Sequence, residues 1–85
     1  MYYVYILVNE EGSMYIGYSS DLKKRILAHK RGEVKETKVG NWDLVYYEAY
    51  RSQKDARRRE ISLKKSGQGR RWLKERIKNS LSGRS

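Results

Sequence analysis

The sequence predicts an α+β domain, a three-stranded antiparallel sheet flanked by helices in the order ββαβαα. Apolar and aromatic runs at residues 2–8, 14–18 and 42–50 are typical of strands, and segments with helical spacing follow the second and third runs. Eighty-five residues suffice for one small core. We therefore expect a single domain over residues 1–81 and a frayed tail at residues 82–85.

The first eighteen residues predict a β-hairpin. Every position from Tyr2 to Val8 is apolar or aromatic, which indicates a central strand covered on both faces. Residues 9–13 are polar and include a glycine, as a short hairpin loop requires, and residues 14–18 form the return strand. The hairpin holds five of the eight tyrosines. Because buried phenol hydroxyls need hydrogen-bond partners, this concentration is a first indication of a site.

Capping residues and apolar spacing predict the helices. The first begins after the N-cap segment Ser19–Asp21, buries a stripe of Leu22 and Ile26, and runs to about Lys30, with Gly32 as its C′ glycine. Residues 33–41 are polar and without periodicity, so we expect a loop. Ser52 opens a second helix that runs to about residue 65, and residues 66–69 break it. The apolar stripe of the third helix consists of Trp72, Leu73, Ile77 and Leu81.

The net charge of +10 is concentrated in one part of the chain. Residues 1–50 hold seven basic and seven acidic residues, whereas residues 51–85 hold thirteen basic and three acidic ones. This asymmetry favours a polyanionic partner, nucleic acid ahead of an anionic membrane. Cysteine is absent, which excludes disulfides and cysteine-based zinc sites. No apolar run approaches the length of a membrane span, so we expect a soluble, cytoplasmic protein with no membrane partner.

Three residues outside the hairpin are candidates for chemistry. Glu60 falls on the apolar face of the second helix with Ala56 and Leu63, where a carboxylate needs a cation or hydrogen bonds. It is either a metal ligand or half of an ion pair with a neighbouring Arg or Lys. Arg25 and His29, four residues apart, share the edge of the first helix's stripe. A lone Arg usually covers apolar surface, and a lone His is usually a packing residue.

Taken together, these residues resemble the GIY-YIG nuclease domain over nearly the whole chain. Tyr15-Ile16-Gly17 matches the second triplet of the family, and Tyr3-Val4-Tyr5 stands where the first triplet, Gly-Ile-Tyr, is expected. Arg25, His29 and Glu60 follow at the intervals of the family's functional residues. The resemblance is greatest to the short, standalone bacterial members.

The resemblance implies a metal-dependent endonuclease that hydrolyses phosphodiester bonds with little sequence specificity, in DNA repair or recombination. It implies that Glu60 binds Mg²⁺ or another divalent cation such as Mn²⁺ and that Arg25 holds the scissile phosphate. Tyr15 would be the base and Tyr5 would position the water, with cationic neighbours lowering the phenol pKa. His29 completes the catalytic set, and Gly17 would allow close approach.

The expected partner is nucleic acid, DNA in preference to RNA, bound by a monomer. The residues expected to follow its phosphates are basic side chains of the second and third helices. They are Arg51, Lys54, Arg57, Arg58, Lys64, Lys65, Arg70 and Arg71. The altered first triplet leaves an alternative open: a nucleic-acid-binding module on the same fold that cleaves weakly or not at all.

Overall fold

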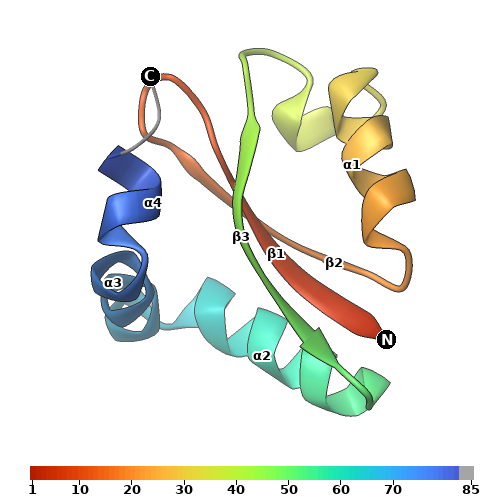
Figure 1. The fold of residues 1–85 in the computed structure, drawn as a ribbon, viewed down its shortest axis with the longest axis vertical. Helices are drawn as coiled ribbons and strands as arrows, with labels where there is room; N and C mark the ends of the chain where they lie inside the picture. Colours follow the sequence, from red (N-terminus) through yellow and green to blue (C-terminus); the bar gives the residue numbers. More distant parts are fainter. Residues whose placement is uncertain (83–85) are drawn as a thin grey trace.

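The structure, a computed structural model, describes residues 1–82 and confirms the predicted α+β class. Its elements are β1 (Tyr2–Val8), β2 (Met14–Ser19), α1 (Leu22–Lys30), the 3-10 turn η1 (Lys35–Thr37), β3 (Asp43–Tyr50), α2 (Gln53–Lys65), α3 (Gly67–Arg76) and α4 (Lys78–Ser82). The strands cross at the centre, between α1 on one side and α3 and α4 on the other (Figure 1). None of the helices within residues 1–82 is long and apolar enough to cross a bilayer.

The strand order is β2-β1-β3, antiparallel throughout, so the strand expected to be central is central. The β1–β2 loop closes around Asn9, whose side-chain oxygen accepts hydrogen bonds from the backbone N–H groups of Glu11 and Ser13. Gly12 adopts a φ of 83°, which an L-residue rarely adopts. The predicted hairpin is therefore present, and its return strand extends one residue further, to Ser19.

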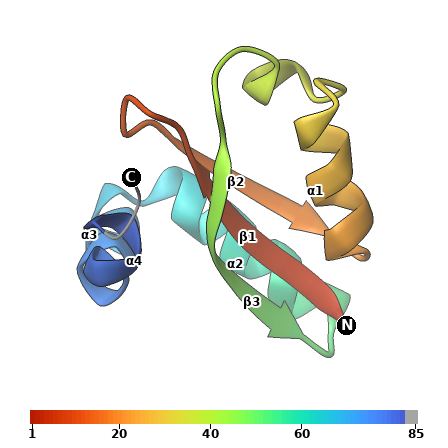
Figure 2. The same ribbon diagram turned by 45° about the horizontal axis from the view of Figure 1, so that its top comes forward.

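Successive residues of β1 point to opposite faces of the sheet, and each face has its own cover. Val4, Ile6 and Val8 pack against the α2 and α3 side chains in the main core, together with Ala56 and other apolar residues. On the other face Tyr5 contacts His29 of α1. α1 and α2 therefore lie on opposite sides of the sheet, as the tilted view shows (Figure 2).

α1 begins and ends as predicted, but its buried side differs. The Asp21 side chain accepts from the Lys24 N–H, and Gly32 follows the helix with a φ of 73°. Leu22 and Ile26, the predicted stripe, are only half-buried, whereas His29 is 7% exposed. The physical reason is that α1 meets the sheet at the aromatic rings of the hairpin, so the helix edge packs deepest.

The C-terminal helices correct the predicted apolar stripe. Ser66 ends α2 and caps α3, with its side chain accepting from the Gly69 N–H. Leu73 is 2% exposed and in the core, but Trp72 is 68% exposed, so its assignment to the stripe was wrong. Adjacent residues of a helix point about 100° apart around its axis, so a narrow contact with the core buries Leu73 and leaves its neighbour Trp72 outside. Ser82, expected in the tail, ends α4, and residues 83–85 lie outside the described residues.

Glu48 links β3 to α2 through a satisfied polar network. Arg59 donates to both of its carboxylate oxygens at 2.9 Å. The hydroxyls of Tyr46 and Tyr50 also donate to it. Burial disfavours the charged carboxylate, but the hydrogen bonds from Arg59 and the two tyrosines outweigh burial and hold the pKa of Glu48 below its ordinary value. This network joins β3 to the middle of α2.

Candidate active site

Tyr5 lies at the centre of a hydrogen-bonded cluster between the sheet and α1. It is 0% exposed, and its hydroxyl is 2.6 Å from Nε2 of His29. Arg25 donates to the same hydroxyl from Nε at 3.3 Å. The ring lies directly over Gly17 on β2, where any Cβ would overlap its ring carbons and hydroxyl oxygen. Gly17 thus allows a close approach, but the group that approaches it is the Tyr5 side chain and not the backbone or phosphate that was expected.

His29 is held from its other side by a residue that the sequence interpretation missed. Its Nδ1 lies 2.6 Å from the hydroxyl of Thr37, which is 3% exposed. Thr37 ends η1 inside residues 33–41, so the expected featureless loop has an ordered turn that also buries Val34. The signal available in the sequence was the pair of less polar residues, 34 and 37, one turn apart. A neutral imidazole has one donor nitrogen and one acceptor nitrogen, and a hydroxyl can serve as the partner of either one. The Tyr5 and Thr37 hydroxyls therefore satisfy both ring nitrogens of His29.

Tyr15 and Arg25 complete the cluster. The Tyr15 ring packs edge-on against His29, with centroids 5.0 Å apart, and tilted against Tyr5 at 6.2 Å. Hydrogen bonding to Tyr5 and, less strongly, to Tyr15 raises the pKa of Arg25, so the guanidinium stays a cation. The structure therefore brings together four of the five predicted catalytic residues.

Burial sets the protonation of Tyr5 and His29 at neutral pH. Burial raises the pKa of Tyr5 to about 12 despite the Arg25 hydrogen bond. Arg25 does lower the pKa of Tyr5, but burial outweighs it, so the expected net lowering is wrong for Tyr5, which stays protonated at neutral pH. Burial, and then the charge of Arg25, lowers the pKa of His29, so the imidazole is neutral at pH 7.

Glu60 belongs to α2 and its side chain is buried between this helix and the sheet, on the opposite face of the sheet from His29. It is 8% exposed. Arg57 donates to one carboxylate oxygen at 3.3 Å and Lys64 to the other at 2.9 Å. Of the two interpretations left open by the sequence, the ion pair is the one present. The Arg57 guanidinium also stacks on the Tyr18 ring of β2, 3.8 Å from its centroid, so the Glu60 pair lies against the β2 edge of the sheet.

A pocket at the β2 edge links the two faces. It has a volume of about 370 Å³, and its lining includes Tyr15 and Lys64, the cation paired with Glu60. Arg70 and Glu36 also line it. Tyr15 therefore contacts the His29 cluster on one side and faces the Lys64–Glu60 pair on the other. Within residues 1–82 no group of three or more His, Asp or Glu side chains is placed to hold a metal ion.

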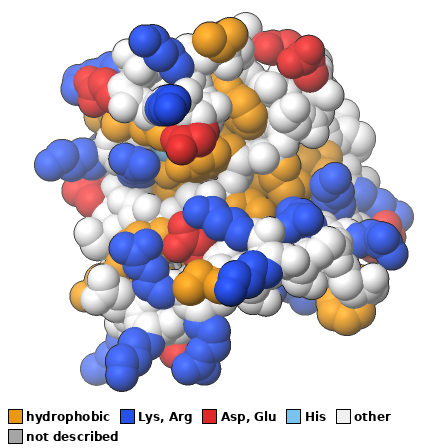
Figure 3. Space-filling model, turned by 180° about the vertical axis from the view of Figure 1, so that it is seen from behind, with side chains coloured by type: hydrophobic (Ala, Val, Ile, Leu, Met, Phe, Trp, Pro, Cys, Tyr) orange, Lys and Arg blue, Asp and Glu red, His pale blue; other side chains and the backbone are white. Residues whose placement is uncertain are grey.

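Some of the basic residues predicted to contact phosphates are already engaged in hydrogen bonds or ion pairs within the protein, and others are not. Arg57 and Lys64 are engaged by Glu60, and Arg70 donates to the backbone carbonyls of Leu63 and Lys64 at 2.7 Å. Arg71 donates to the Gln68 side chain at 3.3 Å. The others are exposed and form no ion pair among residues 1–82: Arg51, Lys54, Arg58 and Lys65. Seen from behind, basic side chains cover much of the lower half of the molecule (Figure 3).

Comparison with known proteins agrees with this fold. A family model described as the GIY-YIG catalytic domain matches residues 1–72. The chain therefore belongs to the GIY-YIG family, which supports a nuclease-type function acting on nucleic acid.

Within that family the chain is similar to UPF0213 proteins. One from Staphylococcus saprophyticus is 38% identical over 65 residues, covering 74% of this chain and 79% of the relative. One from Staphylococcus aureus is 40% identical over the same length and coverage. The solution NMR structure of a UPF0213 protein from Bacillus halodurans superposes with a TM-score of 0.56 at 38% identity, covering 86% of this chain and 82% of that one.

Proposed function

We propose that the protein is a metal-dependent endonuclease that hydrolyses phosphodiester bonds in DNA with little sequence specificity. The observation that carries the proposal is the position of Tyr15, between the Arg25–His29 cluster and the edge pocket that holds Lys64. A phosphate in that pocket would have a phenol and cations around it and a carboxylate behind Lys64. These are the groups that phosphodiester hydrolysis uses.

The residues of the cluster divide the work by their protonation. Arg25 donates to Tyr5 from Nε, and a terminal nitrogen that Tyr15 does not engage would donate to a non-bridging oxygen of the phosphate. The Tyr5 hydroxyl keeps its proton at neutral pH. It would therefore orient the attacking water by hydrogen bonding and would not act as the base. Tyr15, beside the pocket, is the candidate that takes the proton of the attacking water. His29 and Thr37 hold the Tyr5 hydroxyl in place.

Glu60 fits a metal ion that takes one carboxylate from the protein and its remaining ligands from water and phosphate, which is usual for Mg²⁺. Both of its oxygens accept from cations in this structure, so a metal would replace at least one of them. Lys64 is half exposed and long enough to turn to a phosphate in the same pocket. When bound, the metal would neutralise charge on the leaving oxygen.

The exposed basic side chains of α2 would bind the backbone without reading bases. About five phosphate contacts on duplex DNA predict that log K falls with log[salt] at a slope near −4.5. We expect this slope for the wild type, and a shallower one by roughly 1 for Arg58→Gln.

A binding module with little or no cleavage is the second candidate, and one observation favours it. Glu60 is already neutralised by Arg57 and Lys64, and this weakens its attraction for a metal ion. In this alternative the same surface binds nucleic acid, and the cluster stabilises the fold.

Cleavage assays separate the two candidates. Pure protein is incubated with supercoiled, linear, single-stranded and branched DNA in Mg²⁺ or in chelator. We expect Mg²⁺-dependent cleavage that is lost in Arg25→Ala and Glu60→Gln and retained in Lys24→Ala, a matched change on the exposed side of α1. Equal binding by all four proteins with no cleavage of any substrate would favour the binding module. Equal cleavage by all four would point to a contaminant and contradict the proposed site.

A further inference from the structure

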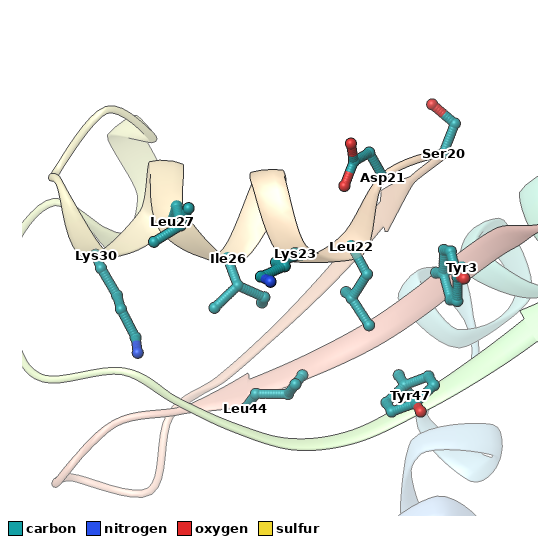
Figure 4. Close-up of a pocket in the computed structure, with 10 residues that line it drawn as sticks. All are labelled: Tyr3, Ser20, Asp21, Leu22, Lys23, Ile26, Leu27, Lys30, Leu44 and Tyr47. Atoms are coloured by element: carbon teal, nitrogen blue, oxygen red, sulfur yellow. The ribbon is translucent and has the colours of Figure 1, made fainter.

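A second groove lies on the side of α1 away from Arg25. It has a volume of about 610 Å³ and is bounded by α1, β1 and β3. Leu22 and Ile26 point from α1 toward the sheet, Tyr3 and Tyr47 lie at one end, and Lys30 reaches down at the other (Figure 4). Tyr3 and Tyr5 share a face of β1, so this groove and the proposed catalytic cluster lie on the same side of the sheet.

A β-bulge in β3 gives the groove its floor. Ile6 pairs with Tyr46 and Leu7 with Leu44, so Val45 is the extra residue. In a regular strand Leu44 and Tyr47, three positions apart, would point to opposite faces. The bulge puts both on the α1 face, while the two residues between them pack toward the core.

The floor and wall of the groove are left open in the described part of the chain. Tyr47 is 53% exposed, Leu27 44% and Leu44 40%. The Tyr3 and Tyr47 rings meet edge-on, with centroids 6.0 Å apart at 64°. One face of an aromatic pair and a set of aliphatic side chains therefore stand uncovered beside each other.

The rim of the groove is positively charged. Lys23 and Lys30 line it and form no ion pair among residues 1–82. The one acidic lining residue, Asp21, caps α1 through the Lys24 N–H. Aromatic rings beside unpaired cations are the combination that binds single-stranded nucleic acid, in which rings stack on bases and cations meet the backbone.

We propose that this groove binds an unpaired nucleobase of the nucleic acid substrate, with Tyr47 stacking on the base and Lys23 and Lys30 near its phosphates. The inference rests on the proposed nuclease function and narrows its substrate to DNA with a single-stranded flank. A base within a duplex has both faces stacked and its edge paired, so it cannot enter a groove walled by a helix. An unpaired base has a free face to offer and needs no hydrogen-bonding code.

The test compares Tyr47→Ala with Trp72→Ala, a matched loss of an exposed aromatic ring on α3 outside the groove. Binding to fluorescein-labelled oligo(dT) and to a blunt duplex is measured by fluorescence anisotropy. We expect Tyr47→Ala to weaken oligo(dT) binding roughly tenfold, the effect of losing one base stack, and to leave duplex binding unchanged. Trp72→Ala should bind both as wild type does. Lys23→Gln/Lys30→Gln should weaken oligo(dT) binding and reduce its salt dependence.

A measurement on the wild-type complex with oligo(dT) tests the proposed contact without relying on the variants. Intermolecular NOEs between thymine methyl groups and the Tyr47 ring would support base binding in the groove. Equal oligo(dT) binding by wild type and Tyr47→Ala would overturn it, as would a wild-type dimer, seen by sedimentation, that Tyr47→Ala abolishes. Wild type that shows the Tyr47-dependent binding but cuts no DNA supports the groove and refutes the nuclease. Wild type that cuts DNA while Tyr47→Ala binds normally refutes the groove alone.

Discussion

Gly17→Ala is expected to be the most damaging single-methyl change in the hairpin. A Cβ at residue 17 would overlap the ring and hydroxyl of Tyr5. That ring cannot move aside cheaply, because it is fully buried and its hydroxyl is bonded to His29 and Arg25. Either β2 separates from β1 or the Tyr5 hydroxyl leaves its partners.

The magnitude follows from these two responses. Overpacking a core typically costs about 1–3 kcal/mol. Leaving buried polar partners unsatisfied costs about 1–3 kcal/mol more. We expect a loss of roughly 2–6 kcal/mol, against a total stability of about 4–13 kcal/mol for a domain of this length. In a domain of this size each kcal/mol lost lowers Tm by roughly 4–8 °C.

Thermal and urea denaturation followed by circular dichroism measure this loss. Gly67→Ala is the matched control, because it lies in the first turn of α3, has no positive φ and has no atom closer than 3.8 Å to the added carbon. It should be neutral or slightly stabilising. A Gly17→Ala loss below about 0.5 kcal/mol would refute the reasoning, as would the same loss in a Tyr5→Leu background, where the clash is absent.

Three further predictions concern charged groups. Glu48→Gln should cost about 2 kcal/mol in urea unfolding, because it weakens the charge-assisted bonds from Arg59, and an unchanged midpoint would contradict this. The folded pKa of His29 lies below its ordinary 6.5, so the unfolded chain binds the proton more readily. The contribution of His29 to the free energy of unfolding should therefore be complete above about pH 6.5 and be lost as the pH falls below that value. His29→Gln should reduce this pH dependence. A free energy of unfolding that instead rises as the pH falls would mean that the folded pKa is raised. Lys64→Met should tighten Mn²⁺ binding about fivefold by calorimetry, since it removes one cation from Glu60, and weaker binding would mean that Lys64 supports the metal site.

The fold was predictable because its signals are local. The unbroken apolar run of β1, the Asn9–Ser13 loop and the caps at Asp21 and Ser52 each specify conformation within a few residues. The choice of central strand also followed, because only a strand covered on both faces tolerates seven consecutive apolar or aromatic residues. Trp72 was misassigned because a hydrophobic residue next to a true core position carries no sign of which of the two faces inward.

Which residues gather around Tyr5 was predictable, but the hydrogen bonds that join them were not. Spacing placed Arg25 and His29 on one helix edge, and the structure brings both to Tyr5. The partner of His29 on the far side, Thr37, sits in a polar segment where no periodicity identifies a buried hydroxyl. The raised pKa of Tyr5 depends on total burial, which a charge pattern does not reveal.

The sharpest test of the proposed site follows Arg25 and Glu60 together. Wild-type protein is titrated with thymidylyl-thymidine, a single phosphodiester, in Mg²⁺, while NMR records the Arg25 Nε–H and the Glu60 carboxyl carbon. If one phosphate and its metal lie between them, both signals shift with a common Kd, and the Glu60 shift requires phosphodiester and Mg²⁺ together. An Arg25 shift with Glu60 unmoved, or two different Kd values, would mean that the two faces of the sheet do not share a site.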